Sequence, residues 1–321
     1  MSRPRVLLTR RWPEAAQAAV AQAFDATLNQ TDAPMSAQAL AEALRSFDAV
    51  APTVSDKITG DMFAGATAKI VTNYGVGYTN IDVDAAKAAG VVVTNTPGVL
   101  TDCTADLAMG LMLAAARRIG EGEREVRAGK WTGWRPMHMI GVKVTGATLG
   151  VIGFGRIGQA VARRAHHGFG MKVIYYDAYP IPAEAAAAVG AEKRDSAEAV
   201  LAEADFVTLH TTGGAENRHL INAARLRRMK PTAILVNTAR GECVDEAALA
   251  EALRAGVIAG AGLDVFEAEP KVNPALAALE NVVLAPHLGS ATLTTRVAMG
   301  MTALANLQAF FAGETPPNRV A

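Results

Sequence analysis

The fold is decided by Ala147-Thr148-Leu149-Gly150-Val151-Ile152-Gly153-Phe154-Gly155-Arg156-Ile157-Gly158. This stretch predicts an apolar strand, a glycine turn and the start of a helix. Gly153 permits the tight turn, Gly155 lets the backbone approach a pyrophosphate, and Gly158 lets the helix pack on the strand. The free N–H groups and the positive dipole of the helix start favour phosphate groups.

A second apolar run, Met171–Tyr176, ends at Asp177, nineteen residues beyond Gly158. A carboxylate at this distance meets the ribose hydroxyls of a bound dinucleotide, so the two segments together predict an NAD site. No Lys or Arg follows Asp177 until Lys193. Since a carboxylate repels a 2′-phosphate, we expect NADH to be preferred over NADPH.

Short apolar runs alternate with helical stretches on both sides of this motif, which favours parallel sheets covered by helices. We predict an α/β protein with two doubly wound domains. A Rossmann dinucleotide-binding domain, 99–290, is inserted in a smaller flavodoxin-like substrate-binding domain, 1–98 and 291–321. The predicted strands are 6–9, 49–51, 69–73 and 91–95 in the smaller domain, and 149–152, 172–176, 206–209, 233–237, 261–265 and 282–284 in the larger one. The predicted helices include 15–24, 37–46, 83–89, an interrupted stretch over 101–129, and 292–311.

Composition excludes several partners. The chain has 321 residues, with Lys+Arg and Asp+Glu balanced at 31 each, so neither nucleic acid nor an anionic membrane is an expected partner. Its two cysteines, Cys103 and Cys243, match no metal-binding spacing and favour a reducing compartment. The apolar run at 6–9 is too short for a signal-peptide core, and we expect a cytoplasmic protein.

Three polar residues follow consecutive strands of the larger domain. Arg240 follows the strand at 233–237, Glu269 follows the strand at 261–265, and His287 follows the strand at 282–284. Ligands of open α/β sheets bind at this carboxyl edge. Arginine can hold a carboxylate, and histidine can exchange a proton while a neighbouring carboxylate fixes its tautomer. Beside a nicotinamide, these roles describe hydride transfer to a 2-oxo acid. Taken singly, each could instead be a loop charge or a strand cap.

The chain resembles the D-isomer-specific 2-hydroxyacid dehydrogenases, and within them the glyoxylate/hydroxypyruvate reductases. The latter branch is indicated by Trp131-Thr132-Gly133-Trp134-Arg135-Pro136. Formate dehydrogenases of this superfamily carry glutamine where Glu269 stands, which disfavours that activity. The matching stretches are 74–82, 94–98, 150–158, 237–241, 264–270 and 286–292.

The resemblance implies that Arg240 binds substrate, that His287 is the acid/base and that Glu269 pairs with it. It also implies that the backbone of Val76 and Gly77 holds the substrate carboxylate. A homodimer built on the stretch 101–129 and the arm 131–140 is implied as well. The implied cofactor-binding residues are Thr104, Gly153, Gly155, Arg156, Ile157, Gly158, Asp177, His210, Thr211, Thr238, Ala239, Arg240, Asp264, His287 and Gly289.

Two departures from the family pattern bear on these expectations. Thr79 replaces the usual aspartate, and nothing in the sequence explains it. The loop Thr211-Thr212-Gly213-Gly214 replaces a Pro-Leu-Thr-like segment, and we expect it to be more flexible and to weaken cofactor binding modestly. The expected activity is reversible reduction of glyoxylate or hydroxypyruvate to the D-2-hydroxy acid. The alternatives are a reductase of 2-ketoaldonic or other longer 2-oxo acids, and a dinucleotide-sensing binding protein.

Overall fold

The computed structural model describes residues 3–321 and divides into two compact units. Unit 1 comprises the described residues up to Leu100 together with Ser290–Ala321, and unit 2 comprises Thr101–Gly289. Both are built on a wholly parallel sheet, which confirms the predicted class of two doubly wound domains.

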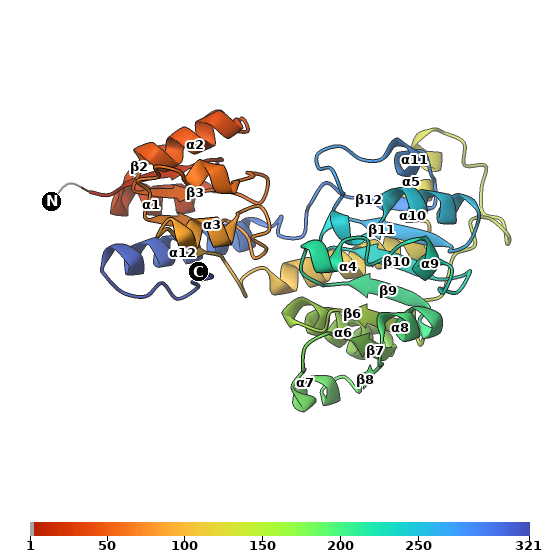
Figure 1. Ribbon diagram of the computed structural model, residues 1–321. Helices are drawn as coiled ribbons and strands as arrows, with labels where there is room; N and C mark the ends of the chain where they lie inside the picture. Colours follow the sequence, from red (N-terminus) through yellow and green to blue (C-terminus); the bar gives the residue numbers. More distant parts are fainter. Residues whose placement is uncertain (1–2) are drawn as a thin grey trace. The chain divides into compact units, whose positions relative to one another are not determined.

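Unit 1 contains a five-stranded sheet in the order β2-β1-β3-β4-β5, the flavodoxin-like order (Figure 1). Two of its helices, α1 and α12, pack on each other, and α12 also contacts β4. The strands are β1 (Arg5–Leu8), β2 (Asp25–Leu28), β3 (Ala49–Ala51), β4 (Ile70–Thr72) and β5 (Val92–Thr94). The helices are α1 (Glu14–Ala23), α2 (Ala37–Ser46), the 3-10 turn η1 (Gly60–Phe63), α3 (Val83–Ala88) and α12 (Leu293–Phe311).

The core of unit 1 follows the two-residue period of its strands. On β1, Val6 and Leu8 pack into one apolar cluster with residues of α1 and α12. Leu7, between them, packs into a second cluster with residues of α2 and η1. A strand that buries both faces reads as an unbroken apolar run, which is why β1 and β3 could be predicted from sequence.

Unit 2 contains a seven-stranded sheet in the order β12-β11-β10-β9-β6-β7-β8 (Figure 1). From β6 the chain adds β7 and β8 toward one edge of the sheet, and it then adds β9 to β12 on the other side of β6 toward the opposite edge. The strands are β6 (Thr148–Ile152), β7 (Lys172–Tyr176), β8 (Glu192–Lys193), β9 (Phe206–Leu209), β10 (Ile234–Asn237), β11 (Gly260–Leu263) and β12 (Val282–Leu284). The helices are α4 (Thr101–Ala116), α5 (Ile119–Arg127), α6 (Arg156–Phe169), α7 (Ala183–Ala187), α8 (Ala197–Glu203), α9 (Ala223–Leu226), α10 (Glu246–Arg254) and α11 (Pro274–Ala277), with 3-10 turns η2 (Ala215–Asn217) and η3 (Gly241–Cys243).

The structure contains two strands that the sequence did not predict. The larger sheet has seven strands rather than six, because the exposed pair β8 was too short and polar to give a pattern. The edge strand β2 was missed since only alternate residues are half-buried. The interrupted helical stretch predicted over 101–129 is present as two helices, separated where Arg118 adopts a left-handed conformation with φ of 53°. Within residues 3–321, every helix is too short or too polar to cross a lipid bilayer.

Candidate active site

The glycine turn after β6 has the geometry that its sequence predicts. Gly153 has a φ of 91°, and a Cβ there would lie 2.6 Å from the carbonyl carbon of His210. A Cβ on Gly158 would lie 2.2 Å from the carbonyl oxygen of Gly153, so only glycine lets α6 approach the turn. Gly155 caps α6 and borders open space, while Arg156 and Ile157 begin the helix. The helix therefore presents free N–H groups beside a turn with room for a phosphate.

Asp177 follows β7, next to this turn. Its Oδ2 accepts a hydrogen bond from the amide of Phe154 at 2.6 Å, and its Oδ1 accepts one from the amide of Tyr179 at 2.9 Å. These two amides fix the carboxylate at the end of β7, the strand beside β6. This is the place where the ribose of a dinucleotide meets a Rossmann sheet.

The next loops of unit 2 carry buried polar atoms that lack protein partners. Burial lowers the pKa of His210 to about 3, so its ring is neutral. Its Nε2 lies 2.9 Å from the hydroxyl oxygen of Thr208, whereas Nδ1 has no hydrogen-bond partner within residues 3–321. The buried hydroxyl of Thr238 likewise has none among the described residues. Unsatisfied buried groups of this kind call for a ligand or water. Together with the glycine turn and Asp177, they fit a dinucleotide.

Arg240 is held by a turn that closes β10. The Asn237 side chain accepts from the amide of Ala239 at 3.0 Å and donates to the carbonyl of Arg240 at 2.9 Å. The Arg240 guanidinium donates to the carbonyl of Ala239 at 2.7 Å. Burial lowers the pKa of Arg240, and the negative charge of Glu269 opposes that shift. A partly desolvated guanidinium gains strongly from an anionic ligand.

Glu269 and His287 form the pair that the sequence predicts. Nδ1 of His287 lies 2.8 Å from Oε2 of Glu269, whose other oxygen accepts from the amide of Phe266 at 3.0 Å. Burial disfavours the charged form of Glu269, but the hydrogen bond and charge of His287 bring its pKa below the ordinary value. An ionised carboxylate only accepts hydrogen bonds, so Nδ1 carries the proton of this contact.

Asp264 holds the loop that carries His287. Its carboxylate accepts from the amides of Leu288 at 2.6 Å and Gly289 at 2.8 Å, and its carbonyl accepts from the amide of His287 at 2.9 Å. The hydroxyl of Thr104, in α4, donates to the carbonyl of Gly289 at 3.0 Å. Burial raises the pKa of Asp264, while the two amides and the His287 charge oppose that rise. The predicted residues Thr104, Asp264, His287 and Gly289 thus lie in one hydrogen-bonded group.

Val76 and Gly77 lie in unit 1, in the turn that follows β4. The carbonyl of Val76 accepts from the side chain of Asn95 at 2.8 Å, and that of Gly77 accepts from the side chain of Asn73 at 2.8 Å. Within residues 3–321, the amides of Val76 and Gly77 have no hydrogen-bond acceptor. Two adjacent free amides in a fixed turn are suited to binding a carboxylate.

Sequence reasoning missed the side chains that shape these turns. Asn237, Asn73 and Asn95 each bond the backbone of a predicted site residue or its neighbour. The available signal was an asparagine directly at, or just after, the end of a buried strand. Thr79 is exposed, and nothing in the structure explains why a threonine replaces the usual aspartate at this position.

The loop that begins at Thr211 is tied to η3 and to its own turn. The Thr211 hydroxyl lies 3.6 Å from the sulfur of Cys243. The amide of Gly214 donates to Glu242 at 2.7 Å, and Asn217 donates to the carbonyl of Thr212 at 3.0 Å.

Comparison with known proteins places this geometry in a family. Residues 109–289 match the model of the D-isomer specific 2-hydroxyacid dehydrogenase NAD binding domain. A glyoxylate reductase of Thermococcus litoralis is 48% identical over 323 aligned residues, which cover 99% of this chain and 97% of the relative. The chain belongs to the D-isomer-specific 2-hydroxyacid dehydrogenase family.

Further members of this dehydrogenase family agree in sequence and in structure. A glyoxylate reductase of Korarchaeum cryptofilum is 49% identical, with 99% of this chain and 96% of the relative covered. The NADPH-dependent glyoxylate/hydroxypyruvate reductase of Sinorhizobium meliloti, solved with NADP and malonate, superposes with a TM-score of 0.89. It is 35% identical, and the match covers 100% of this chain and 97% of that one. Unit 2 of this dehydrogenase therefore contains the binding domain for a nicotinamide dinucleotide.

Proposed function

We propose that this chain reduces glyoxylate or hydroxypyruvate to the D-2-hydroxy acid, reversibly, with NADH as the preferred cofactor. The observation that carries the proposal is the 2.8 Å Glu269–His287 pair, at the same sheet edge as Arg240. Support comes from relatives named glyoxylate reductase that match 99% of the chain.

His287 acts as the proton donor in reduction. Because Glu269 occupies Nδ1, Nε2 is the nitrogen that delivers a proton to the carbonyl oxygen of the substrate. Glu269 fixes the ring orientation and stabilises the protonated ring. In the oxidation direction, the neutral Nε2 takes the proton from the hydroxyl group.

Each unit carries a group suited to the substrate anion, Arg240 in unit 2 and the turn at Val76 and Gly77 in unit 1. The Arg240 guanidinium has further N–H groups beyond its bond to Ala239, and these hold the 2-oxo acid and polarise its carbonyl. The free amides of Val76 and Gly77 hold the carboxylate. This assignment rests on the two amides having no acceptor within residues 3–321.

The dinucleotide is held by the residues that fit it in unit 2. The amides at Gly155, Arg156 and Ile157 take the pyrophosphate and Asp177 takes the ribose, while Gly153 and Gly158 shape the turn. His210 and Thr211 lie on the adenosine side. Thr104, Thr238, Ala239, Arg240, Asp264, His287 and Gly289 surround the nicotinamide end. When bound, the nicotinamide supplies or accepts the hydride.

The preference for NADH rests on Asp177. A 2′-phosphate beside its carboxylate would bring like charges together, which costs on the order of 1–3 kcal/mol, or roughly 10- to 100-fold in kcat/KM. The neighbours that follow, Ala178, Tyr179 and Pro180, offer no compensating cation.

The test is an initial-rate survey with NADH and NADPH over glyoxylate, hydroxypyruvate, a 2-ketoaldonic acid and longer 2-oxo acids. We expect the highest kcat/KM with the two small acids and NADH. Higher kcat/KM with a longer acid would move the assignment to that substrate class. Tight NADH binding without turnover of any acid would indicate a dinucleotide-sensing protein and would overturn the proposal.

We also propose a homodimer. Six apolar side chains are exposed on α5 and the arm that follows it, and Trp134 is 82% and Met137 79% exposed. An exposed apolar group of this size in one segment is typical of a protein interface. The six are Ile119, Val126, Trp131, Trp134, Met137 and Ile140.

We also propose a cytoplasmic location, which the low cysteine content supports.

A further inference from the structure

The turn around Val76 and Gly77 takes its shape from the amide of Asn73. Nδ2 of this buried asparagine donates to the carbonyl of Gly77 at 2.8 Å and to the carbonyl of Gly75 at 3.4 Å. Both carbonyls therefore face inward. Since each peptide unit is planar, the direction of a carbonyl also sets the direction of the amide that follows it. The Gly75 carbonyl therefore orients the free amide of Val76, whereas the Gly77 amide follows the Val76 carbonyl, which Asn95 holds. Asn73 thereby helps to set the direction of the Val76 amide, together with the amide of Thr96, which donates to the Gly75 carbonyl at 3.1 Å, and it fixes the far side of the turn through the Gly77 carbonyl.

Asn80 in turn fixes the orientation of Asn73. Nδ2 of Asn80 lies 3.3 Å from Oδ1 of Asn73, and it also donates to the carbonyls of Thr53 and Asp56, both at 3.1 Å. Because Oδ1 of Asn73 accepts from Asn80, the other end of that amide, Nδ2, must face the turn. If the Asn73 amide were reversed, its oxygen would face the carbonyls of Gly75 and Gly77.

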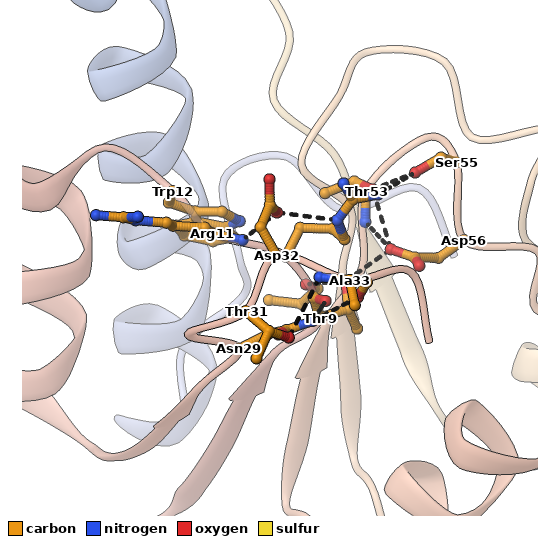
Figure 2. Close-up of polar contacts among 12 residues, drawn as sticks. Thr9, Arg11, Trp12, Asn29, Thr31, Asp32, Ala33, Thr53, Ser55 and Asp56 are labelled. Atoms are coloured by element: carbon orange, nitrogen blue, oxygen red, sulfur yellow. Dashed lines mark hydrogen bonds and ion pairs between the residues drawn. The ribbon is translucent and has the colours of Figure 1, made fainter. Parts of the chain in front are cut away.

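The carbonyls that anchor Asn80 belong to a rigid loop after β3. The buried carboxylate of Asp56 accepts from the Thr53 amide at 2.7 Å, from the Thr53 hydroxyl at 3.0 Å and from the Thr9 hydroxyl at 2.6 Å. Figure 2 shows this carboxylate beside Thr53, with dashed lines for the bonds that it accepts. The backbone of Asn80 is also fixed, since its carbonyl accepts from the amide of Ile58 at 2.8 Å.

We propose that Asn80 is a positioning residue for substrate binding, which sets the carboxylate-binding turn through Asn73. The inference rests on the proposed function, because it takes Val76 and Gly77 to hold the substrate carboxylate. Asn80 itself does not touch the substrate. It acts by making one orientation of the Asn73 amide the stable one, which holds the Gly75 and Gly77 carbonyls and, through the first of them, the direction of the free Val76 amide.

Asn80→Asp is the sharpest variant, because it keeps the shape of the side chain and removes its donors. An ionised carboxylate would face three oxygen atoms, and reversal of the Asn73 amide would relieve only one of these contacts. We expect the KM for glyoxylate to rise roughly tenfold and kcat to change by less than about twofold, as befits the loss of about one aligned hydrogen bond in substrate binding. The inhibition constant of oxamate, which carries the same carboxylate, should rise in parallel.

Asn29→Asp is the matched control. Nδ2 of Asn29 also donates to two backbone carbonyls of unit 1, those of Thr9 and Ala33, at 2.8 Å each, but it has no bond to Asn73 or to the turn. Asn29 lies in the same polar group after β1 and β2 (Figure 2). The KM of the Asn29→Asp variant for glyoxylate should stay within about twofold of the KM of the original chain, because the lost donors lie outside the turn.

Further readouts separate positioning from a general loss of structure. Asn80→Ala removes the donors without adding an anion, so its KM should rise less than that of Asn80→Asp, and it decides the question if the aspartate variant does not fold. NADH affinity, measured by fluorescence titration, should not change in either variant. An unchanged KM and oxamate inhibition constant in both would overturn the inference, as would a parallel loss of kcat, KM and NADH affinity. Absence of 2-oxo acid reduction in the original chain would overturn the proposed function instead.

Discussion

At the scale of single residues, the Glu269–His287 pair determines how the reaction depends on pH. Glu269 has a pKa below its ordinary value of 4.5, so it stays ionised throughout the neutral range. Reduction needs the protonated ring, so kcat/KM for reduction falls as pH rises, while that for oxidation rises. Glu269→Gln removes the charge that supports protonation, and we expect the midpoint of the reductive profile to move to lower pH. His287→Ala should lose most activity at every pH. A Glu269→Gln protein that is folded and keeps the original midpoint would contradict the pairing.

Asp177 is the residue at which cofactor choice can be tested. Asp177→Asn nearly keeps the shape and removes the charge that opposes a 2′-phosphate, at the loss of one of the two bonds that Asp177 accepts from backbone amides. We expect the ratio of kcat/KM with NADH to that with NADPH to fall by roughly tenfold, mainly through improved use of NADPH. The control is Glu184→Gln, which removes an exposed charge from α7. A ratio that falls equally in both variants would indicate a general charge effect rather than recognition at Asp177.

At the scale of elements, long apolar runs were predictable and short polar segments were not. β3 and β9 have the predicted bounds, because buried parallel strands are apolar on both faces. β8 has two exposed residues and pairs only at the edge of the sheet, so its position depends on β7. The same division holds in the candidate site. Arg240, Glu269 and His287 could be located as polar residues after buried strands. The bonds of Asn73, Asn80 and Asn237 depend on loop geometry that has no local pattern.

The N-terminal cap of α2 offers a stability test at this scale. Ser36 accepts from the amide of Ala39 at 3.1 Å, which satisfies one of the helix's free donors. Ser36→Ala should therefore lower the free energy of unfolding by about 1 kcal/mol. Among the described residues, the Ser46 hydroxyl in the last turn of the same helix bonds only the side chain of Glu42, at 3.0 Å. Ser46→Ala should therefore change the free energy of unfolding by less than about 0.5 kcal/mol. Equal effects in chemical denaturation would show that the cap contributes nothing.

At the scale of the whole molecule, the exposed apolar side chains of α5 and the arm predict association. We expect sedimentation at micromolar concentration to show a dimer. Trp134→Ser should shift the protein toward monomer, because it removes a large apolar anchor of the kind that dominates interfaces. Leu293→Ser, at a side chain that is 74% exposed outside this segment, should leave the sedimentation coefficient unchanged. A monomer in the original chain at that concentration would refute the dimer.

The position of α12 in the chain has a consequence during synthesis on the ribosome. The face of the unit 1 sheet that carries Val6 and Leu8 shares its apolar cluster with Met299, Ala303 and Leu307 of α12. These residues are translated about 200 positions after β5, which at about 5–20 residues per second means a delay of roughly 10–40 s. Throughout that interval the nascent chain has an incomplete first unit, while the whole of Thr101–Gly289 emerges and can fold. The strands of unit 1 are therefore translated before unit 2 but belong to the last of the two units to be completed, and until then their uncovered apolar residues are natural targets for chaperones.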